Sequence, residues 1–237
     1  MPIVIPAGSA MPFPHPELAS AEGLVAIGGD LDTGRLLEAY RCGIFPWYSA
    51  GQPVLWWSPD PRMVLLPREL RISRSLRRKL AHGDFRITLD SAFRAVIESC
   101  AAPRRSHPGA GTWITAEMRD AYCQLHAEGH AHSVETWLDD RLVGGLYGVS
   151  LGGAFFGESM FSRVTDASKV ALAHLARQLD AWNFSLIDCQ VPSAHLASLG
   201  AREMPRPVFL GVLAEALTTP DRPGRWNFEI QSAEEAS

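Results

Sequence analysis

The most informative part of this chain is a glycine-rich apolar run, Gly152-Gly153-Ala154-Phe155-Phe156-Gly157-Glu158-Ser159-Met160-Phe161-Ser162, together with a second run, Leu186-Ile187-Asp188-Cys189-Gln190. Apolar runs of this length bounded by glycine predict buried strands. We therefore expect Glu158, Asp188 and Gln190 where the interior of a sheet meets its end. Buried carboxylates are costly unless they bind something, and parallel sheets place their sites at the carboxyl ends of strands. The alternative for each carboxylate is a structural role, as a helix cap or in a satisfied buried pair.

The elements around these two runs predict an α+β fold. Strands are expected over residues 133–138, 141–149 and 154–157 as an antiparallel meander, and apolar positions at helical spacing predict a helix over Ser168–Trp182. Strand, strand, helix, strand is the core order of the N-acetyltransferase-like (GNAT-like) fold, in which the helix crosses between parallel neighbours. Members that use coenzyme A carry a glycine-rich loop before that helix, which binds the pyrophosphate. The corresponding segment here, Phe161–Ala167, has no glycine and contains Asp166, which argues against coenzyme A.

The N-terminal part of the chain predicts a second, smaller unit. An apolar strand is expected over Leu24–Ile27, followed by a helix over Leu31–Cys42. The dipeptide Asp60-Pro61 is the best candidate for a boundary. We therefore expect a small N-terminal α/β domain over residues 1–61 and a larger GNAT-like catalytic domain over residues 62–237.

Composition indicates a globular protein of the reducing cytoplasm. Of the 237 residues, 46% are hydrophobic and 20% charged, which is ordinary for such proteins. No run approaches the roughly 18 apolar residues of a membrane span, and Met1–Pro6 lacks the features of a signal peptide. The four cysteines are scattered, so we expect neither a disulfide framework nor a zinc site. Residues 219–237 are expected to form a polar tail with mobile ends.

Charge is distributed unevenly along the chain. The formal net charge is −4, yet the segment from Arg68 to Arg86 carries seven basic residues against two acidic ones. This pattern excludes a uniformly basic nucleic-acid coat and is consistent with one cationic patch on an acidic body. The basic residues recur at three- and four-residue spacing within a helix predicted over Glu69–Ala81, which puts several on one face. They include Arg71, Arg74, Arg77 and Arg78. The alternative is a solvated charged face without a partner.

Aromatic residues gather in segments flanked by proline or glycine. Four of the seven tryptophans occur there: Trp47, Trp56, Trp57 and Trp113. Such a cluster is either a corner of the core or a set of stacking platforms for nucleic-acid bases.

Three histidines close together in sequence suggest a metal site: His126, His130 and His132. His126 and His130 are four residues apart, but Gly129 is expected to end the helix between them, and no acidic ligand follows at useful spacing. We therefore expect no metal ion.

Several motifs resemble those of the leucyl/phenylalanyl-tRNA–protein transferase family. They are Gly28-Gly29-Asp30-Leu31, Gly43-Ile44-Phe45-Pro46-Trp47, Leu55-Trp56-Trp57-Ser58-Pro59-Asp60-Pro61-Arg62, Thr112-Trp113-Ile114-Thr115, Gly157-Glu158-Ser159-Met160-Phe161-Ser162-Arg163 and Leu186-Ile187-Asp188-Cys189-Gln190-Val191. The matches run in order over about residues 12 to 210. The resemblance implies an enzyme that moves Leu or Phe, and Met less well, from aminoacyl-tRNA to the α-amine of proteins beginning with Arg or Lys, the substrates of an N-degron pathway. It implies ester aminolysis without metal or cofactor.

The resemblance also implies residue roles. Asp188 would polarise Gln190, whose amide oxygen draws a proton from the incoming ammonium, and Glu158 would hold that ammonium. Because glutamine is a poor base, Gln190 can instead orient the amine while the leaving 3′-oxygen or water takes the proton. Two tryptophans, Trp47 and Trp113, are implied to stack on the terminal adenine. The residues implied to surround the aminoacyl group are Tyr40, Phe155, Leu175 and Ile187. Two arginines, Arg74 and Arg78, are implied to contact tRNA phosphates. The family can carry phenylalanine at the position of Leu175, which leaves the Leu-to-Phe preference open.

Two rival functions remain at this point. One is an acetyltransferase that uses coenzyme A, against which the missing glycine loop speaks. The other is a non-catalytic module that binds tRNA or degrons, which a turnover assay would distinguish from an enzyme.

Overall fold

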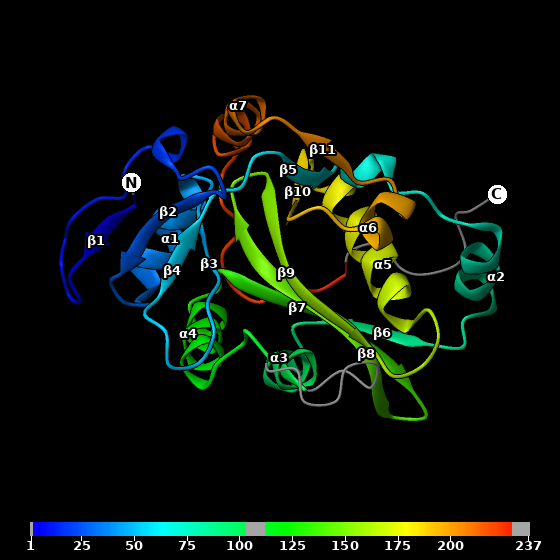
Figure 1. Cartoon of the computed structure of the whole chain (residues 1–237). Helices are drawn as coiled ribbons and strands as arrows, with labels where there is room; N and C mark the ends of the chain where they lie inside the picture. The colour runs from blue at the N-terminus through cyan, green and yellow to red at the C-terminus, as the bar shows by residue number, and fades with distance from the viewer. Residues whose placement is uncertain (1, 103–111, 229–237) are drawn as a thin grey trace.

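The computed structural model describes residues 2–102 and 112–228 and contains two sheets (Figure 1). The larger sheet has seven strands. In spatial order they are β11 (Arg202–Met204), β5 (Arg62–Leu65), β10 (Leu186–Gln190), β9 (Ala154–Ser162), β8 (Arg141–Leu151), β7 (Ala131–Leu138) and β6 (Arg86–Leu89). The smaller sheet has the order β1 (Ile3–Ile5), β2 (Leu24–Gly28), β4 (Leu55–Trp57) and β3 (Phe45–Pro46). The predicted α+β fold, with a smaller N-terminal sheet beside a larger one, is confirmed.

The centre of the larger sheet is the predicted strand, strand, helix, strand unit. β8 and β9 are antiparallel, and helix α5 (Ala167–Ala181) leads from β9 to its parallel neighbour β10. The parallel pairing runs from Leu186 opposite Ala154 only as far as Asp188 opposite Phe156. Beyond that point the two strands part while β9 continues along β8. The expectation that the β9 strand ends at Gly157 is therefore wrong, because β8 gives β9 a partner as far as Ser162.

Both central strands are irregular where they separate. Along β9, Ser159 pairs with Tyr147 of β8 and Gly157 pairs with the next residue of β8, Gly148. Glu158 is therefore an extra, bulged residue of β9. In β10 the register with β5 shifts between Asp188 and Gln190, and Gln190 has a φ of 64°. A positive φ is uncommon for a residue other than glycine and is typical of functional sites.

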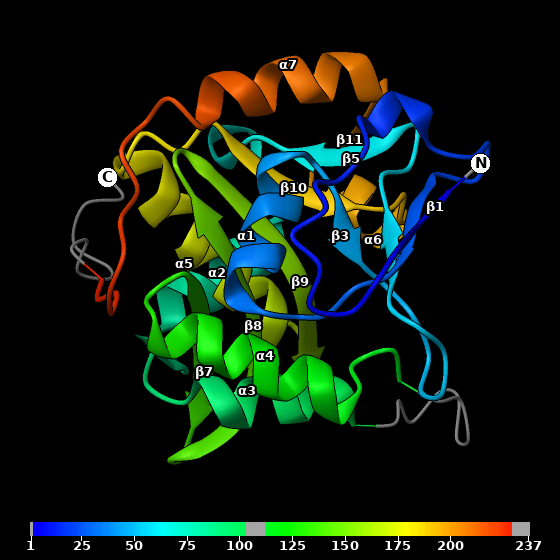
Figure 2. The same cartoon turned by 90° about the vertical axis from the view of Figure 1, so that its left-hand side faces the viewer.

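The two faces of the larger sheet are covered by different helices (Figure 2). Because side chains alternate along a strand, Phe155 packs on the face of α5, and its neighbour Phe156 packs on the opposite face. That opposite face is covered by α3 (Phe93–Ala101) and α4 (Ala116–Ala127). Thr115 caps α4 through a hydrogen bond from the Met118 backbone N to its Oγ1, 3.2 Å, which fits the sequence pattern.

The smaller sheet is joined to the larger one by a common core. Helix α1 (Thr33–Arg41) packs between the sheets, and Leu36 belongs to the same hydrophobic cluster as Phe209 of α7 (Arg206–Ala216). A Cβ on Gly43 would lie 2.9 Å from the Phe209 ring, so glycine permits this close approach. The strand and helix predicted before residue 43 are confirmed. The boundary between residues 61 and 62 stays a prediction.

The basic helix is shorter than the sequence pattern indicates. A 3₁₀ turn, η2 (Pro67–Glu69), comes first, and α2 (Arg74–His82) begins only after Ser73, whose Oγ accepts a hydrogen bond from the Leu76 N, 3.2 Å. The prediction that the helix starts at Glu69 is wrong, because this serine cap fixes the first turn. Two further short helices are η1 (Pro16–Leu18) and α6 (Ala194–Ser198).

The C-terminal segment is docked. Trp226 is only 4% exposed and packs against the core on the α5 side. Residues 219–228 are therefore held against the fold at Trp226, although most of them are exposed. The expected mobility of the tail stays a prediction, and residues 229–237 lie outside the described part of the chain. None of the helices that the structure describes has the length and apolar character needed to traverse a bilayer.

Candidate active site

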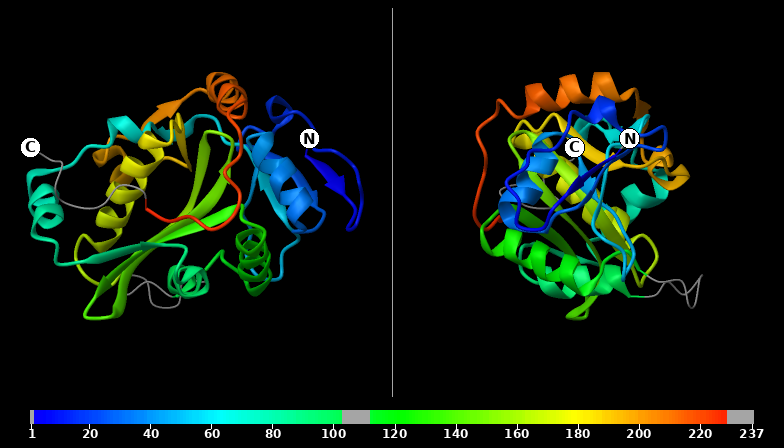
Figure 3. Two further views of the ribbon diagram at one scale, coloured as in Figure 1. Left: turned by 180° about the vertical axis from the view of Figure 1, so that it is seen from behind. Right: turned by 60° about the vertical axis from the view of Figure 1, so that its left-hand side comes forward.

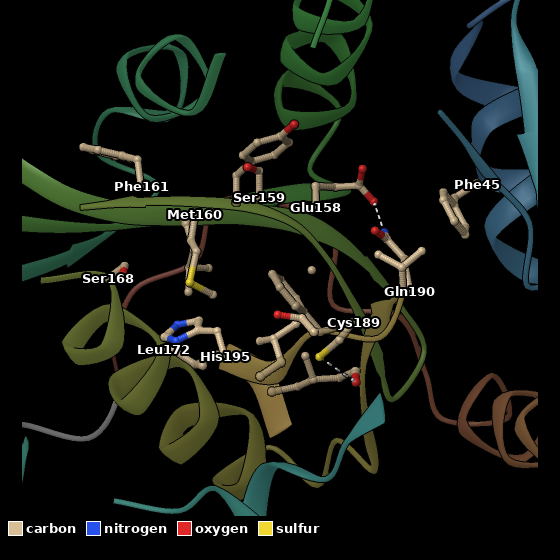
Figure 4. A pocket seen from close by; sticks show the side chains of 18 of the residues that line it. Phe45, Glu158, Ser159, Met160, Phe161, Ser168, Leu172, Cys189, Gln190 and His195 are labelled. Atoms are coloured by element: carbon tan, nitrogen blue, oxygen red, sulfur yellow. Dashed lines mark hydrogen bonds between the residues drawn. The ribbon is translucent and has the colours of Figure 1, made fainter. Parts of the chain in front are cut away.

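A cavity of about 510 Å³ lies where β9 and β10 part (Figure 4). Most of its lining comes from β8, β9, β10, α5 and α6, and the rest comes from Phe45–Trp47 of the smaller unit and from Trp113, which precedes α4. The residues that line it include Phe45, Pro46, Trp47, Trp113, Leu146, Phe155, Glu158, Met160, Leu172, Leu175, Ile187, Cys189, Gln190, Val191 and His195. Among the lining residues that the structure describes, Glu158 alone carries a carboxylate.

The bulge in β9 turns the Glu158 carboxylate toward helices α1 and α4, where two tyrosines hold it. Tyr40 donates a hydrogen bond to Oε1, 2.7 Å, and Tyr122 donates one to Oε2, 3.0 Å. The two hydroxyl groups also contact each other. From β10, the Gln190 amide Nε2 donates to Oε1, 2.8 Å, as the dashed line in Figure 4 shows. The carboxylate is therefore fixed by three donors at the edge of the cavity.

Burial makes this carboxyl group weakly acidic. Glu158 is 7% exposed, and desolvation raises its pKa from 4.5 to about 7, although the hydrogen bonds from Tyr40, Tyr122 and Gln190 act in the opposite direction. Burial also raises the pKa values of the Tyr40 and Tyr122 hydroxyl groups well above 10. The tyrosines thus remain hydrogen-bond donors while Glu158 can change its protonation state near neutral pH.

Asp188 is engaged differently from what the resemblance implies. Its carboxylate forms a fully buried bidentate pair with Arg62, with Nε to Oδ1 at 2.8 Å and Nη2 to Oδ2 at 2.6 Å. Its contact with Gln190 is a hydrogen bond from the Gln190 backbone N to Oδ1, 2.9 Å, and not one with the side-chain amide. The Asp188 carboxylate therefore fixes the backbone that carries Gln190.

Arg62 ties this pair to the smaller sheet. Its guanidinium lies between the rings of Phe45 and Phe209, 4.7 and 4.6 Å from their centroids, and Nη1 donates to the Gly43 carbonyl, 3.1 Å. Such stacking suits the planar guanidinium better than it would suit a lysine ammonium. Because Phe45 also lines the cavity, one buried arginine links both sides of the site.

The two tryptophans implied as stacking platforms both line the cavity. Trp47 follows β3 and is 44% exposed, and the Trp57 indole donates to its backbone carbonyl, 2.7 Å. Trp113 precedes α4 and is half-buried. The cavity therefore offers aromatic surface from two separate elements.

The residues expected around the aminoacyl group are brought together only in part. Phe155, Leu175 and Ile187 line the cavity and belong to one hydrophobic cluster. Tyr40 is fully buried behind Glu158 and is not part of the cavity lining. Tyr40 instead contacts the Glu158 carboxylate.

The two arginines expected to contact tRNA lie apart from the cavity. Arg74 and Arg78 are exposed on α2, which packs against α5. Neither of them forms an ion pair with an acidic residue within the described ranges 2–102 and 112–228. Their charge is therefore presented to solvent.

Sequence reasoning missed two residues of the site. Arg62 opens an apolar strand, and a lone cation in such a strand is a usable signal for a buried pair with an acid such as Asp188. Tyr122 gives no such signal, since one tyrosine on the inner face of an amphipathic helix is ordinary core. Only the fold brings it to Glu158.

Two family models and the most similar curated relatives name the same family. A family model described as leucyl/phenylalanyl-tRNA protein transferase matches residues 64–214, and a model of that family's N-terminal domain matches residues 29–60. Relatives named leucyl/phenylalanyl-tRNA–protein transferase occur in Nitrosospira multiformis, with 56% identity over 95% of this chain and 97% of the relative, and in Nitrosomonas europaea, with 58% identity over 94% of each. A solved GCN5-related N-acetyltransferase from Kribbella flavida covers 73% of this chain and 61% of its own, with a TM-score of 0.36 and 12% identity.

The protein is therefore an enzyme, and more specifically an aminoacyltransferase. The chain belongs to the leucyl/phenylalanyl-tRNA protein transferase family. Chemically, a buried carboxyl group with a pKa of about 7 can bind a cation or accept a proton, and here it lies beside an amide at the edge of a largely apolar cavity.

Proposed function

We propose that this enzyme transfers Leu or Phe, and Met less well, from aminoacyl-tRNA to the α-amine of proteins that begin with Arg or Lys, which marks them for an N-degron pathway in the cytoplasm. The observation that carries the proposal is the position of the Glu158–Gln190 pair at the edge of a cavity with apolar walls and two tryptophans. The names of the close relatives support the donor and the two amino acids.

In this proposal the cavity binds the end of the donor. The indoles of Trp47 and Trp113 stack on the terminal adenine, an interaction worth roughly 1–3 kcal/mol per base. The aminoacyl side chain enters the apolar region formed by Phe155, Leu175 and Ile187. An apolar pocket selects by size and cannot sharply distinguish neighbouring hydrophobic side chains. This agrees with an enzyme that uses more than one amino acid.

Arg74 and Arg78 bind the phosphates of the acceptor stem. Their exposed charges fit a contact with the backbone of RNA, which carries little sequence preference. Asp166 at the start of α5 is paired with Lys169, 2.8 Å, and places an acid where an anion such as a pyrophosphate would bind in coenzyme A enzymes. This arrangement favours an aminoacyl-tRNA over an acyl-coenzyme A as the donor.

The reaction is aminolysis of an ester. The α-amine attacks the carbonyl carbon, a C–N bond forms, the C–O bond to the terminal ribose breaks, and the leaving 3′-oxygen takes up a proton. The amine must first be neutral, and an α-ammonium has a pKa of about 8. Glu158, with a pKa of about 7, is well matched to hold that ammonium and draw its proton. Gln190 uses its amide nitrogen to contact Glu158, so its oxygen can orient the amine.

Transfer of labelled leucine tests this function directly. We expect the protein to attach leucine from charged tRNA to a peptide beginning with Arg, and to leave a matched peptide beginning with Ala unlabelled. Gln190→Ala should slow transfer strongly while the protein stays folded by circular dichroism. A protein that binds charged tRNA without transfer would be a binding module, and one that instead binds coenzyme A in a titration would be an acyl-coenzyme A enzyme.

A further inference from the structure

The docked C-terminal segment, residues 219–228, packs behind the apolar wall of the cavity. In the left view of Figure 3 it descends from α7 in red, passes beside the strands of the sheet and turns toward α5. Trp226 belongs to the same hydrophobic cluster as Phe155, Leu175 and Ile187. It does not itself line the cavity.

The Trp226 indole packs next to Phe155, which lines the cavity, while Trp226 does not. The ring centroids of Trp226 and Phe155 are 6.2 Å apart. On its other sides, Trp226 stacks on His132 with centroids 3.5 Å apart and planes 7° apart, and it meets Trp182 edge-on at 4.9 Å. The Phe155 ring, which lines the cavity, is therefore packed against an indole that itself contacts three further rings, those of His132, Trp182 and Phe184.

Hydrogen bonds fix the backbone of this segment at three places. The Gly152 N donates to Asp221 Oδ1, 2.5 Å, the Gly224 N donates to the Gly129 carbonyl, 3.1 Å, and the Trp226 N donates to Asp90 Oδ2, 2.7 Å. A Cβ on Gly129 would come within 2.1 Å of the Gly224 N, so only glycine permits the second contact. The position of the indole is thus determined by the fold and not by packing alone.

We propose that Trp226 is a positioning residue for donor selection, because it holds the Phe155 ring forward and so sets the depth of the apolar pocket. This inference rests on the proposed function, since pocket depth matters only if a Leu or Phe side chain enters it. Protein interiors are close-packed, and removing a buried ring leaves space into which its neighbour can turn. Without the indole, Phe155 moves back, the pocket deepens, and the larger donor side chain gains over the smaller one.

The test compares donors in the Trp226→Ala variant of the full chain. With an Arg-starting peptide as acceptor, the ratio of kcat/KM for Phe-tRNA to that for Leu-tRNA should rise about three- to tenfold relative to the unaltered protein. The Trp226→Phe variant retains an aromatic ring and should restore most of the original ratio. The matched control is Ile97→Ala, which removes a buried side chain of α3 in the other core cluster. It should lower stability without changing the ratio.

Binding provides a readout that does not depend on turnover. Titration calorimetry with non-hydrolysable 3′-amide analogues of leucyl- and phenylalanyl-adenosine should show the same shift toward Phe. A folded Trp226→Ala protein whose donor ratio is unchanged, or moves toward Leu, overturns the inference. If that variant does not fold, the Trp226→Leu variant is tested instead, and an unchanged donor ratio in it would likewise overturn the inference. Failure of the proposed function would look different, because the unaltered protein would then transfer neither amino acid.

Discussion

At the scale of single residues, the site depends on a carboxyl group that is kept buried at some cost. Glu158 is the extra residue of a bulge, and three hydrogen-bond donors surround it. Even so, desolvation raises its pKa to about 7. A group with a raised pKa binds its proton more tightly in the folded state than in the unfolded state, so the folded protein loses stability as the pH rises from about 4.5 to about 7.

Replacing this carboxyl group should therefore change how stability depends on pH. Relative to the unaltered protein, Glu158→Gln should gain up to about 3 kcal/mol in free energy of unfolding between pH 5 and pH 8. The neighbouring tyrosines Tyr40, Tyr122 and Tyr147 have raised pKa values and stay protonated over this range. Urea unfolding of both proteins at the two pH values measures the effect. A stability difference that is the same at both pH values would contradict the assignment.

The buried pair of Arg62 and Asp188 leads to a second prediction. Asp188→Asn would leave the Arg62 guanidinium buried without its counter-ion, which costs about 3–5 kcal/mol in free energy of unfolding. Gln190→Ala is the matched comparison, because it leaves the ion pair intact and should reduce transfer with little loss of stability. Guanidinium unfolding together with the transfer assay separates the two effects. An Asp188→Asn protein that is fully stable yet inactive would instead assign the carboxylate a direct chemical role.

At the scale of elements, the sequence predicts strands and helices well where periodicity and local chemistry agree. The unit from β8 to β10 follows from apolar runs, glycine turns and one amphipathic helix. The bulge that places Glu158 does not, because an extra residue in a strand leaves the apolar pattern almost unchanged. The docking of Trp226 is equally hidden, since its partners are distant in sequence: Asp90, His132 and Phe155.

Helix α2 carries its own prediction. Replacing both Arg74 and Arg78 by glutamine should raise the KM for charged tRNA and flatten its dependence on salt, because each lost phosphate contact lowers the salt slope by about one. The kcat should change little, since neither side chain lines the cavity. Replacing Arg141, which is exposed on β8, by glutamine provides the control. Filter-binding and kinetics at two salt concentrations measure the effect. Unchanged salt dependence in the double variant would show that this face of α2 does not bind tRNA.

At the scale of the whole molecule, one hydrophobic core runs across the boundary expected between residues 61 and 62. Leu36 of α1 and Phe209 of α7 belong to the same cluster, and Arg62 reaches from its own strand to Gly43. The sequence predicts two units from a change of pattern at Asp60-Pro61. It does not predict how far they share a core, because such packing depends on contacts between distant residues.

This shared core should make unfolding cooperative. Scanning calorimetry is expected to give one transition, with calorimetric and van't Hoff enthalpies nearly equal. Leu36→Ala, at a fully buried position of the smaller unit, should lower the Tm of that single transition, with a cost of about 2–5 kcal/mol in free energy of unfolding. Two resolved transitions, of which only one responds to the substitution, would show that the units fold separately.

The wall contributed by Phe45, Pro46 and Trp47 has a consequence for engineering. A chimera that transplants only residues 62–237 would carry Glu158, Gln190 and Trp113, yet its cavity would lack the Trp47 indole and stay open on the side of the smaller sheet. A chimera between homologues that joins the two units near residue 61 must therefore keep cavity residues of both units that fit one another.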